Sequence, residues 1–336
     1  YKRQPPRPPA SRKAASSTAR WRTTVPCSTA RTPGSTMVSP TCMARLDGSA
    51  DPIALGGKAA ALDRLIAHGH PVPRSAVITT EAYRYVVGEG SVRNLIDLLT
   101  TKPDRADVGH IDDDEIDRVF LDAPVPTVVR DDIATVARTL TGPFAVRSSA
   151  TSEDLSSSAF PGQYRTVLGT TPDGLERAVR LVWASLWHAA PRAYRSIRGV
   201  DDRDLAMAVL VMEMVDATAA GVLFTRDPIG DEADVRLETV NGLGDALVSG
   251  AATPTAHTWL RATATDRARD ELGPTVAELV ERSLDLEQLL GGPQDIEFAI
   301  DGDDRLWLLQ ARPITTLGRP SLTRGGIAEM LPGVLP

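Results

Sequence analysis

The stretch 144–169, FAVRSSATSEDLSSSAFPGQYRTVLG, gathers the residues of this chain best suited to bind a polyanion. Arg147 ends a short apolar run, hydroxyl side chains and backbone N–H groups follow, and Gly162 would let the backbone approach a ligand closely. The flanking apolar and β-branched runs predict two strands joined by a long loop. Loops of this length are usually functional, so we expect a mobile lid over residues 148–162. A solvated Ser-rich turn would have the same composition, and the residues alone do not separate the two interpretations.

Lys58 is a second candidate for binding a phosphate, within the segment LGGKAAALDRLI. The apolar spacing predicts a helix whose first turn carries the Gly pair and the lysine, and helix N-termini attract anions. The segment is not a Walker loop, because Pro52 and Ala59 stand where that pattern needs Gly and Ser or Thr. On this segment alone, an ordinary surface lysine is the favoured interpretation.

Residues 294–300 and 305–314 predict two strands joined by Asp301-Gly302-Asp303-Asp304, which is a strong hairpin signal. A register centred on that turn gives a mostly apolar face and a second, more polar face. The pairs on the apolar face would be Ile300 with Arg305, Phe298 with Trp307 and Ile296 with Leu309. The other face would carry Asp295, Glu297, Leu306, Leu308, Gln310 and Arg312.

Three residues of the second face could act at a phosphate site. Glu297 and Gln310 offer hard oxygen ligands for Mg²⁺, and Arg312 could neutralise phosphoryl oxygens. The simpler alternative is the solvated face of a two-sided hairpin, and the residues alone favour it.

The elements that must position these residues lie in one large domain or two. The 336 residues are 42% hydrophobic, which is enough for a sizeable core. Further patterns predict helices over 175–187 and 275–290 and a buried strand over 205–215, followed by strands over 220–225, 235–240 and 257–261. We place an N-terminal subdomain at 46–204, a C-terminal subdomain at 205–316, and a tail or the start of a linker at 317–336.

Residues 1–45 have a different composition from the rest of the chain. They hold nine Lys or Arg and no acid, whereas the remainder has 28 basic against 44 acidic residues. Because this leader is also rich in Pro, Ser and Thr, we expect it to be disordered. It could mimic a transit peptide or a nucleic-acid arm, but it has no amphipathic Arg-bearing helix. The acidic remainder argues against nucleic acid as the main partner.

Cysteine usage and hydropathy bear on the compartment. Cys27 and Cys42 are the two cysteines, and neither has a CxxC or metal-ligand partner, so we expect a reduced, cytoplasmic setting. No apolar run reaches the roughly 18 residues of a membrane span, so we expect no membrane association.

Several of these segments resemble one known family. Arg147-Ser148-Ser149-Ala150, Glu153-Asp154, Phe160-Pro161-Gly162-Gln163 and Thr166 match, in residues and spacing, the ATP-binding domain of phosphoenolpyruvate synthases and rifampicin phosphotransferases, the dikinase-type ATP-grasp family. The segments around Lys58, GVLFTRDP, GLGDALVSG, DIEFAI and LLQARPIT are similar to family text in the same order. The resemblance covers about Leu46 to Thr316.

The resemblance implies an α/β (α+β), ATP-grasp-like fold, in which two subdomains with mixed or antiparallel sheets close on a nucleotide cleft. It implies ATP and Mg²⁺ as ligands, with Glu297 and Gln310 on the metal and with Arg147 and Arg312 as catalytic groups. The implied ATP-binding residues are Lys58, Arg147, Gly162, Thr166, Glu297, Gln310 and Arg312. Two departures could alter nucleotide affinity: Met212 stands where relatives have Gln, and Ala190 where relatives have Arg.

The implied activity is transfer of a phosphoryl group from ATP to a histidine on a swivelling domain, toward pyruvate or a rifamycin-like acceptor. None of the five histidines lies in a Thr-Ser-His type motif and twenty residues follow Thr316, so we expect a phosphohistidine-domain protein to act in trans. The alternative is a non-catalytic nucleotide-binding module or a truncated, inactive family member. A serine hydrolase is disfavoured because no GxSxG elbow is present.

Overall fold

The computed structural model describes residues 42–101, 111–151, 164–202, 205–231, 233–242 and 253–314. All of them belong to one compact unit, Ser39–Pro336. Order begins earlier than expected, because strand β1 (Met43–Arg45) lies inside the segment assigned to the leader. Its apolar residues are buried and its neighbour Cys42 donates its backbone N–H to Asp132, so this end of the segment has packing partners that composition does not reveal. Within the described residues, no helix is long and apolar enough to cross a membrane.

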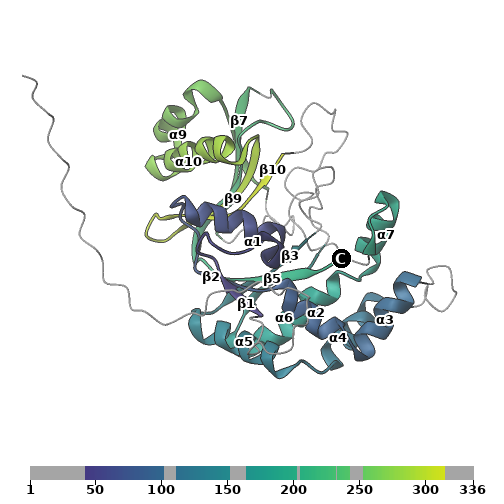
Figure 1. The fold of residues 1–336 in the computed structure, drawn as a ribbon. Coiled ribbons are helices and arrows are strands. Elements are labelled where there is room, and N and C mark those ends of the chain that lie inside the picture. Colours follow the sequence, from purple (N-terminus) through teal and green to yellow (C-terminus); the bar gives the residue numbers. More distant parts are fainter. Residues whose placement is uncertain are drawn as a thin grey trace, which may run out of the picture. The chain divides into compact units, whose positions relative to one another are not determined.

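The first sheet has the strand order β1-β2-β5-β3-β4, and every neighbouring pair is antiparallel. Its further strands are β2 (Ser75–Ile78), β3 (Phe144–Ala150), β4 (Thr166–Thr170) and β5 (Met207–Glu213). The helices that follow its strands in the chain are α2 (Thr80–Val87), α3 (Gly90–Thr101), α4 (Asp113–Asp122), α5 (Thr127–Thr139), α6 (Leu175–Ser185) and α7 (Ala189–Arg198), with a short 3-10 turn at Pro172–Gly174 (Figure 1).

Helix α6 and the turn after it carry two tryptophans, Trp183 inside the helix and Trp187 just beyond its end. Trp183 is fully buried and donates its indole N–H to the carbonyl of Met207 in β5 at 3.0 Å. Trp187 donates to the hydroxyl of Tyr83 in α2 at 2.8 Å. Both indoles are therefore core residues: Trp183 joins α6 to the first sheet, and Trp187 joins the turn after α6 to α2.

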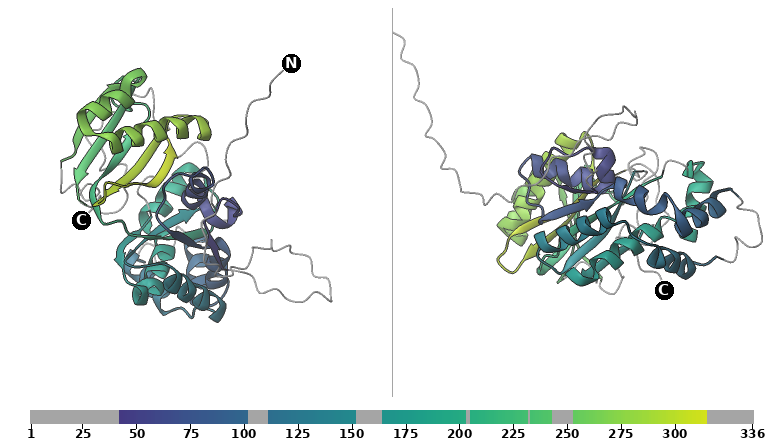
Figure 2. Two further views of the ribbon diagram at one scale, coloured as in Figure 1. Left: turned by 90° about the vertical axis from the view of Figure 1, so that its left-hand side faces the viewer. Right: turned by 60° about the horizontal axis from the view of Figure 1, so that its bottom comes forward.

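The second sheet has the order β10-β9-β6-β7-β8, again antiparallel throughout. Figure 2 shows this part of the chain in green and yellow. Its strands are β6 (Ala217–Phe224), β7 (Asp234–Asn241), β8 (Thr255–Leu260), β9 (Gln294–Asp301) and β10 (Leu306–Pro313). Its helices are α9 (Ala264–Leu272) and α10 (Pro274–Leu290), preceded by a 3-10 turn at Arg261–Thr263. The predicted α/β fold class, with two sheets, is confirmed.

The boundary between the two sheets differs from the one placed after residue 204. Strand β5 pairs with β2 and β3 in the first sheet, so the chain passes to the second sheet between Glu213 and Ala217. The reason is visible in the strand itself, because its residues 207–212 are all buried. A strand that is apolar on both faces belongs in the middle of a covered sheet, and β5 is the central strand of the first one.

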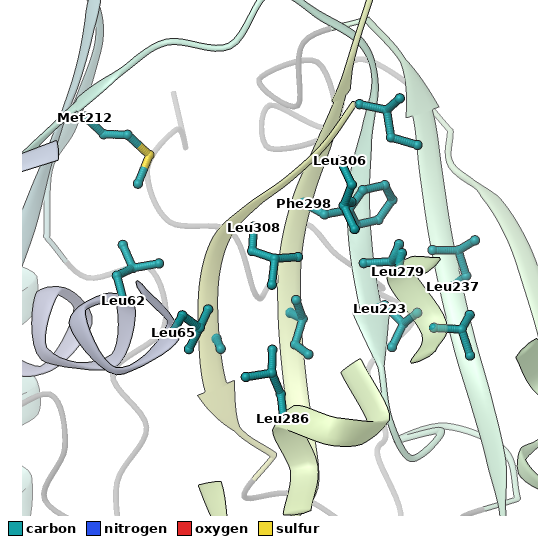
Figure 3. Close-up of a cluster of buried hydrophobic side chains, with 14 of the residues drawn as sticks. Leu62, Leu65, Met212, Leu223, Leu237, Leu279, Leu286, Phe298, Leu306 and Leu308 are labelled. Carbon is teal, nitrogen blue, oxygen red and sulfur yellow. The ribbon is translucent and has the colours of Figure 1, made fainter. Parts of the chain in front are cut away.

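One continuous apolar cluster joins helix α1 (Pro52–Ala67) to the second sheet (Figure 3). Leu62 and Leu65 of α1 belong to the same cluster as Phe298 and Leu308 of the hairpin β9–β10. Leu286 of α10 lies in it as well. One face of the second sheet is thus buried against helices, which leaves the opposite face as the place for polar side chains.

Candidate active site

The hairpin β9–β10 carries the predicted acids, but its pairing differs from the predicted register. Ile300 pairs with Leu306 and Phe298 with Leu308, so the connection is one residue longer than a turn of four. Asp304 is the added residue and adopts a left-handed backbone with φ 60°. As a result Leu306 and Leu308 lie in the apolar cluster and not on the polar face, where the prediction placed them.

A second irregularity at Leu309 restores the polar face. The register shifts between Leu308 and Gln310, so that Gln310 pairs with Glu297 and Arg312 with Asp295. This is a β-bulge, in which one extra residue on β10 opposes the same stretch of β9. The two one-residue shifts add to two residues. Because side chains alternate with a period of two, a shift of two keeps the predicted shared face of these four residues although their predicted pairing is wrong.

The polar face of the second sheet also includes part of β7. Glu238 pairs with Val222 of β6, and Val222 pairs with Glu297 of β9. Since directly opposed residues point to the same face of a sheet, Glu238 shares the face of Glu297. Its neighbour Leu237 belongs to the apolar cluster on the other side, which agrees with this alternation.

Each of three buried carboxylates on this face is bound by one arginine. Arg147 Nη2 lies 2.7 Å from Glu297 Oε2, Arg312 Nε 2.7 Å from Asp295 Oδ2, and Arg236 Nε 2.6 Å from Glu238 Oε1. The other oxygen of each carboxylate, Glu297 Oε1, Asp295 Oδ1 and Glu238 Oε2, makes no hydrogen bond within the part of the chain that the structure describes. A buried carboxylate oxygen without a partner is costly, so the face is built to receive cations or donors.

Two basic residues, one from α1 and one from the first sheet, lie close to this face. Arg147 of β3 donates to Glu297 and also, through Nη1, to the carbonyl of Leu309 at 3.2 Å. Lys58 Nζ lies 3.5 Å from Ser148 Oγ, next to Arg147 in β3. The predicted residues Lys58, Arg147, Glu297, Gln310 and Arg312 are thus brought together from α1, β3 and the hairpin.

The charges of these residues set opposite pKa directions for the two hairpin acids. Burial favours the neutral form of Glu297, but Arg147, Arg312 and Lys58 outweigh it and hold the pKa of this carboxyl below its usual value. Burial raises the pKa of Asp295 despite the nearby Arg312, and the charge of Glu297 adds to the rise. Glu297 is therefore the carboxylate that stays charged most readily.

Lys58 owes its position to a kink in α1. Gly56 has φ 68°, so the regular part of the helix begins after it, slightly later than the predicted first turn. Ser149 of β3 accepts the N–H of Ala59 at 3.0 Å and donates to the carbonyl of Leu55 at 2.8 Å. Ser149, one of the hydroxyl residues of the stretch expected to bind a polyanion, thus fixes the start of the helix against β3.

The remaining predicted residues have different outcomes. Thr166 lies in β4, paired directly with Arg147. Gly162 lies outside the described residues, as does most of the predicted lid. Met212 is buried in the apolar cluster, while Glu213 beside it accepts from Arg74 and from the N–H of Thr141.

Sequence reasoning missed Glu238 and Arg236. The available signal was the alternation in DVRLETV, where Val235 and Leu237 are buried in the cluster and the charged residues between them face the other way. That alternation predicts that Arg236 and Glu238 share a face of their strand. It does not show which strands pair with β9, so the sequence could not place Glu238 on the same face of the sheet as Glu297.

The donors present suit a hard cation that is also bound by a ligand. In the described residues, no group of three or more His, Cys, Asp or Glu side chains could hold a metal ion. Mg²⁺ commonly takes only one or two carboxylates from a protein and completes its shell with phosphate and water oxygens. Oε1 of Glu297, which has no hydrogen bond in the described residues, and the amide of Gln310 fit such a site.

The domain is of the α/β class, with two antiparallel sheets and a buried face on which acids and arginines are paired. Comparison with known families identifies the member of that class. The chain belongs to the family described as pyruvate phosphate dikinase, AMP/ATP-binding domain, which matches residues 53–273 and 260–324.

Curated relatives agree with this assignment. A probable phosphoenolpyruvate synthase of Pyrococcus abyssi is 29% identical over 343 residues, covering 78% of this chain and 42% of the relative. A rifampicin phosphotransferase of Streptomyces sviceus is 34% identical, covering 78% of this chain and 34% of the relative. The prodigiosin synthesizing transferase PigC of Serratia marcescens is 33% identical, covering 84% and 34%. The chain thus spans well under half the length of these relatives.

Solved structures with detectable likeness are more distant. An L-amino acid ligase from Bacillus licheniformis aligns with 51% of this chain and 34% of its own at 15% identity and a TM-score of 0.26. Cdc123 from Schizosaccharomyces pombe aligns with 72% of this chain and 78% of its own at 12% identity and a TM-score of 0.33. The assignment rests on the family match and on the site.

Proposed function

We propose that this domain binds ATP with Mg²⁺ at the polar face of the second sheet and transfers a phosphoryl group from it to a histidine. The observation that carries the proposal is the meeting of Arg147 and Lys58 from the first part with Glu297 of the second. Basic side chains suit the oxygens of a triphosphate, and carboxylate and amide oxygens suit Mg²⁺. Both kinds of side chain lie together at this face.

Each residue has a separate role in this proposal. Lys58 and Arg147 bind phosphate oxygens, Arg312 neutralises charge that develops on the transferring group, and Glu297 with Gln310 holds Mg²⁺. Thr166 contacts the nucleotide from β4, beside Arg147. Mg²⁺ would supply charge neutralisation of the β- and γ-phosphates when bound. Phosphoryl transfer of this kind is mainly a matter of positioning and charge, so no nucleophile from the face itself is required.

The acceptor histidine is proposed to come from a phosphohistidine domain other than this one, acting in trans. Three histidines of the described residues each make a contact within this domain. His188 lies 2.9 Å from Asp117, His257 stacks on Trp259, and His68 contacts the carbonyl of Arg64. The names of the relatives suggest pyruvate or a rifamycin-like molecule as the final acceptor.

Calorimetry tests the nucleotide part of the proposal. Arg147→Ala should weaken ATP binding by about ten- to a hundredfold in the presence of Mg²⁺, the usual cost of a lost charged hydrogen bond. Arg93→Ala is the matched control, because Arg93 pairs with Asp97 on the exposed surface of α3. Unchanged affinity in the Arg147 variant would remove this residue from the site.

A phosphotransfer assay tests the reaction. ATP labelled on its transferring phosphoryl should label a histidine of an added phosphohistidine domain. With pyruvate or a rifamycin the mixture should turn over to AMP, because one of the two terminal phosphoryl groups reaches the acceptor and the other is released to water as inorganic phosphate. Label that stays on this chain, or AMP formed without any added domain, would contradict the proposed acceptor. ATP binding without transfer to any such domain would favour the non-catalytic nucleotide-binding module.

A further inference from the structure

Arg165, the residue before Thr166, is fastened to two helices. It donates its backbone N–H to Ser185 Oγ of α6 at 3.0 Å, and its Nη1 lies 2.6 Å from Asp117 Oδ2 of α4. Thr166 follows directly as the first residue of β4 and pairs with Arg147 of β3. The two bonds of Arg165 therefore act at the point where β4 starts and meets Arg147.

Asp117 holds Arg165 with a carboxylate that is itself held in place. His188, directly before α7, lies with Nε2 2.9 Å from Asp117 Oδ1, so both oxygens of the carboxylate are used. The side chains of Asp117 and His188 are only 13% and 12% exposed. Burial favours the neutral acid, but His188 and Arg165 outweigh it and hold the pKa of Asp117 below its usual value. Asp117 is thus a charged and oriented anchor for Arg165.

The packing of α4 against α6 has a separate support and does not depend on this ion pair. Arg180 of α6 donates through Nη1 and Nη2 to the carbonyls of Leu121 and Ala123 at the end of α4. What the ion pair of Asp117 and Arg165 adds to these helices is a connection to β4.

Strand β4 benefits from such an anchor because it lies at the edge of the first sheet. Among the described strands β3 is its one neighbour, and the ladder between the two is irregular between Phe144 and Val146. The ends of an edge strand open locally at a low free-energy cost, so a side chain bound there determines how firmly the end is held. The anchored end of β4 is the end that carries Thr166.

We propose that Asp117 is a positioning residue of the nucleotide site, which acts through Arg165 to fix the start of β4 and so keeps Thr166 and Arg147 in place for ATP. This inference rests on the proposed function, in which Thr166 and Arg147 contact the nucleotide. Asp117 and Arg165 themselves do not touch the ligand.

Calorimetry of ATP·Mg²⁺ binding by the full chain and its variants tests this inference. Asp117→Asn and Arg165→Gln should each weaken binding about tenfold, as the loss of a supporting partner commonly does. The double variant should bind no more weakly than either single one, because both changes break the same link. Arg180→Gln is the control. It should lower the melting temperature but leave the affinity for ATP unchanged at temperatures where the chain is folded.

A further variant keeps the test decisive if Asp117→Asn fails to fold. Ser185→Ala removes the other anchor of Arg165 without changing any charge, and it should weaken ATP binding by about threefold. Arg165 binding a phosphate directly would instead give unchanged affinity in Ser185→Ala, or losses that add in the double variant.

Either of those results would overturn the inference, as would unchanged affinity in both Asp117→Asn and Arg165→Gln. An equal loss of affinity in Arg180→Gln would reduce the effect to general stability and overturn it as well. In all these cases ATP binding by the wild type leaves the proposed function standing, whereas no ATP binding by the wild type overturns both.

Discussion

Arg147 and Glu297 are each needed by a different part of the proposed ligand, yet they bind each other at 2.7 Å. A cation that takes Glu297 releases Arg147 for a phosphate, so metal and nucleotide should bind cooperatively. Glu297→Gln should abolish the tightening of ATP binding by Mg²⁺, because the amide keeps the shape but not the charge. Calorimetry with and without Mg²⁺ measures this, with the exposed Glu278→Gln as control. Persisting metal dependence would remove Glu297 from the metal.

The two hairpin acids should respond to pH in opposite senses. The lowered pKa of Glu297 means that its charge stabilises the fold above its unfolded pKa of about 4.3, and that this is lost as pH falls through its folded pKa. The raised pKa of Asp295 means that stability is lost as pH rises from about 3.9 through its folded pKa. At pH 7 Glu297→Gln should therefore lower the melting temperature and Asp295→Asn raise it.

Melting curves of both variants and the wild type between pH 3 and pH 7 would check these signs, with both differences shrinking toward the acid end. Two variants that shift the melting temperature in the same direction at pH 7 would show that the charges on this face are not distributed as the structure indicates.

Helix α1 has one glycine at which the neighbouring backbone leaves no room for a side chain. A Cβ on Gly56 would stand 1.9 Å from the backbone oxygen of Ser149, while a Cβ on Gly69 would meet nothing within 4 Å. Both glycines have positive φ, so both variants to alanine carry a backbone cost of about 1 kcal/mol or more. Gly56→Ala should lower the free energy of unfolding by at least about 2 kcal/mol more than Gly69→Ala does, because α1 must also move away from β3 to make room for the added methyl group. Urea unfolding of the two variants provides the comparison, and equal losses would contradict the close packing.

The elements also show how far the sequence could predict the site. Hydrophobic alternation and the turn signal predict both hairpin strands and put Glu297, Gln310 and Arg312 on one face, and the resemblance implies that these residues bind the ligand. The pairing could not be predicted, because Asp304 in the turn and the bulge at Leu309 each add a residue without changing the pattern. Ser149 looked like a ligand-facing hydroxyl, and only the kink at Gly56 shows that it caps a helix.

At the scale of the whole molecule, the two sheets meet through α1 and Arg147. The strand order could not be predicted from the sequence. Strand β5 comes after the other strands of the first sheet in the chain, and its apolar run would suit the middle of either sheet. The structure places it centrally in the first sheet and leaves residues 214–216 as the step to the second. Residues that bind one ligand therefore come from both sheets.

This arrangement predicts that nucleotide protects both sheets. At a concentration of ATP·Mg²⁺ about a hundred times its Kd, global opening should be suppressed about a hundredfold, or about 2.7 kcal/mol. Hydrogen exchange of the slowest amides in β3 and β5 should slow by the same factor as in β6 and β9. Slowing confined to the second sheet would mean that the first contributes nothing to the ligand.

The bulge at Leu309 has a consequence for how the gene can vary. Leu308 and Leu309 are identical neighbours, so loss of either codon yields the same chain, with one leucine opposite Phe298 and Gln310 next to it opposite Glu297. The ladder would become regular and the ligating side chains would keep their face. What would be lost is the Leu309 carbonyl that accepts from Arg147. A deletion of one codon here should thus be tolerated far better than a deletion elsewhere in β9 or β10. There, the loss of one residue would reverse the alternation and point polar side chains of the site toward the apolar core.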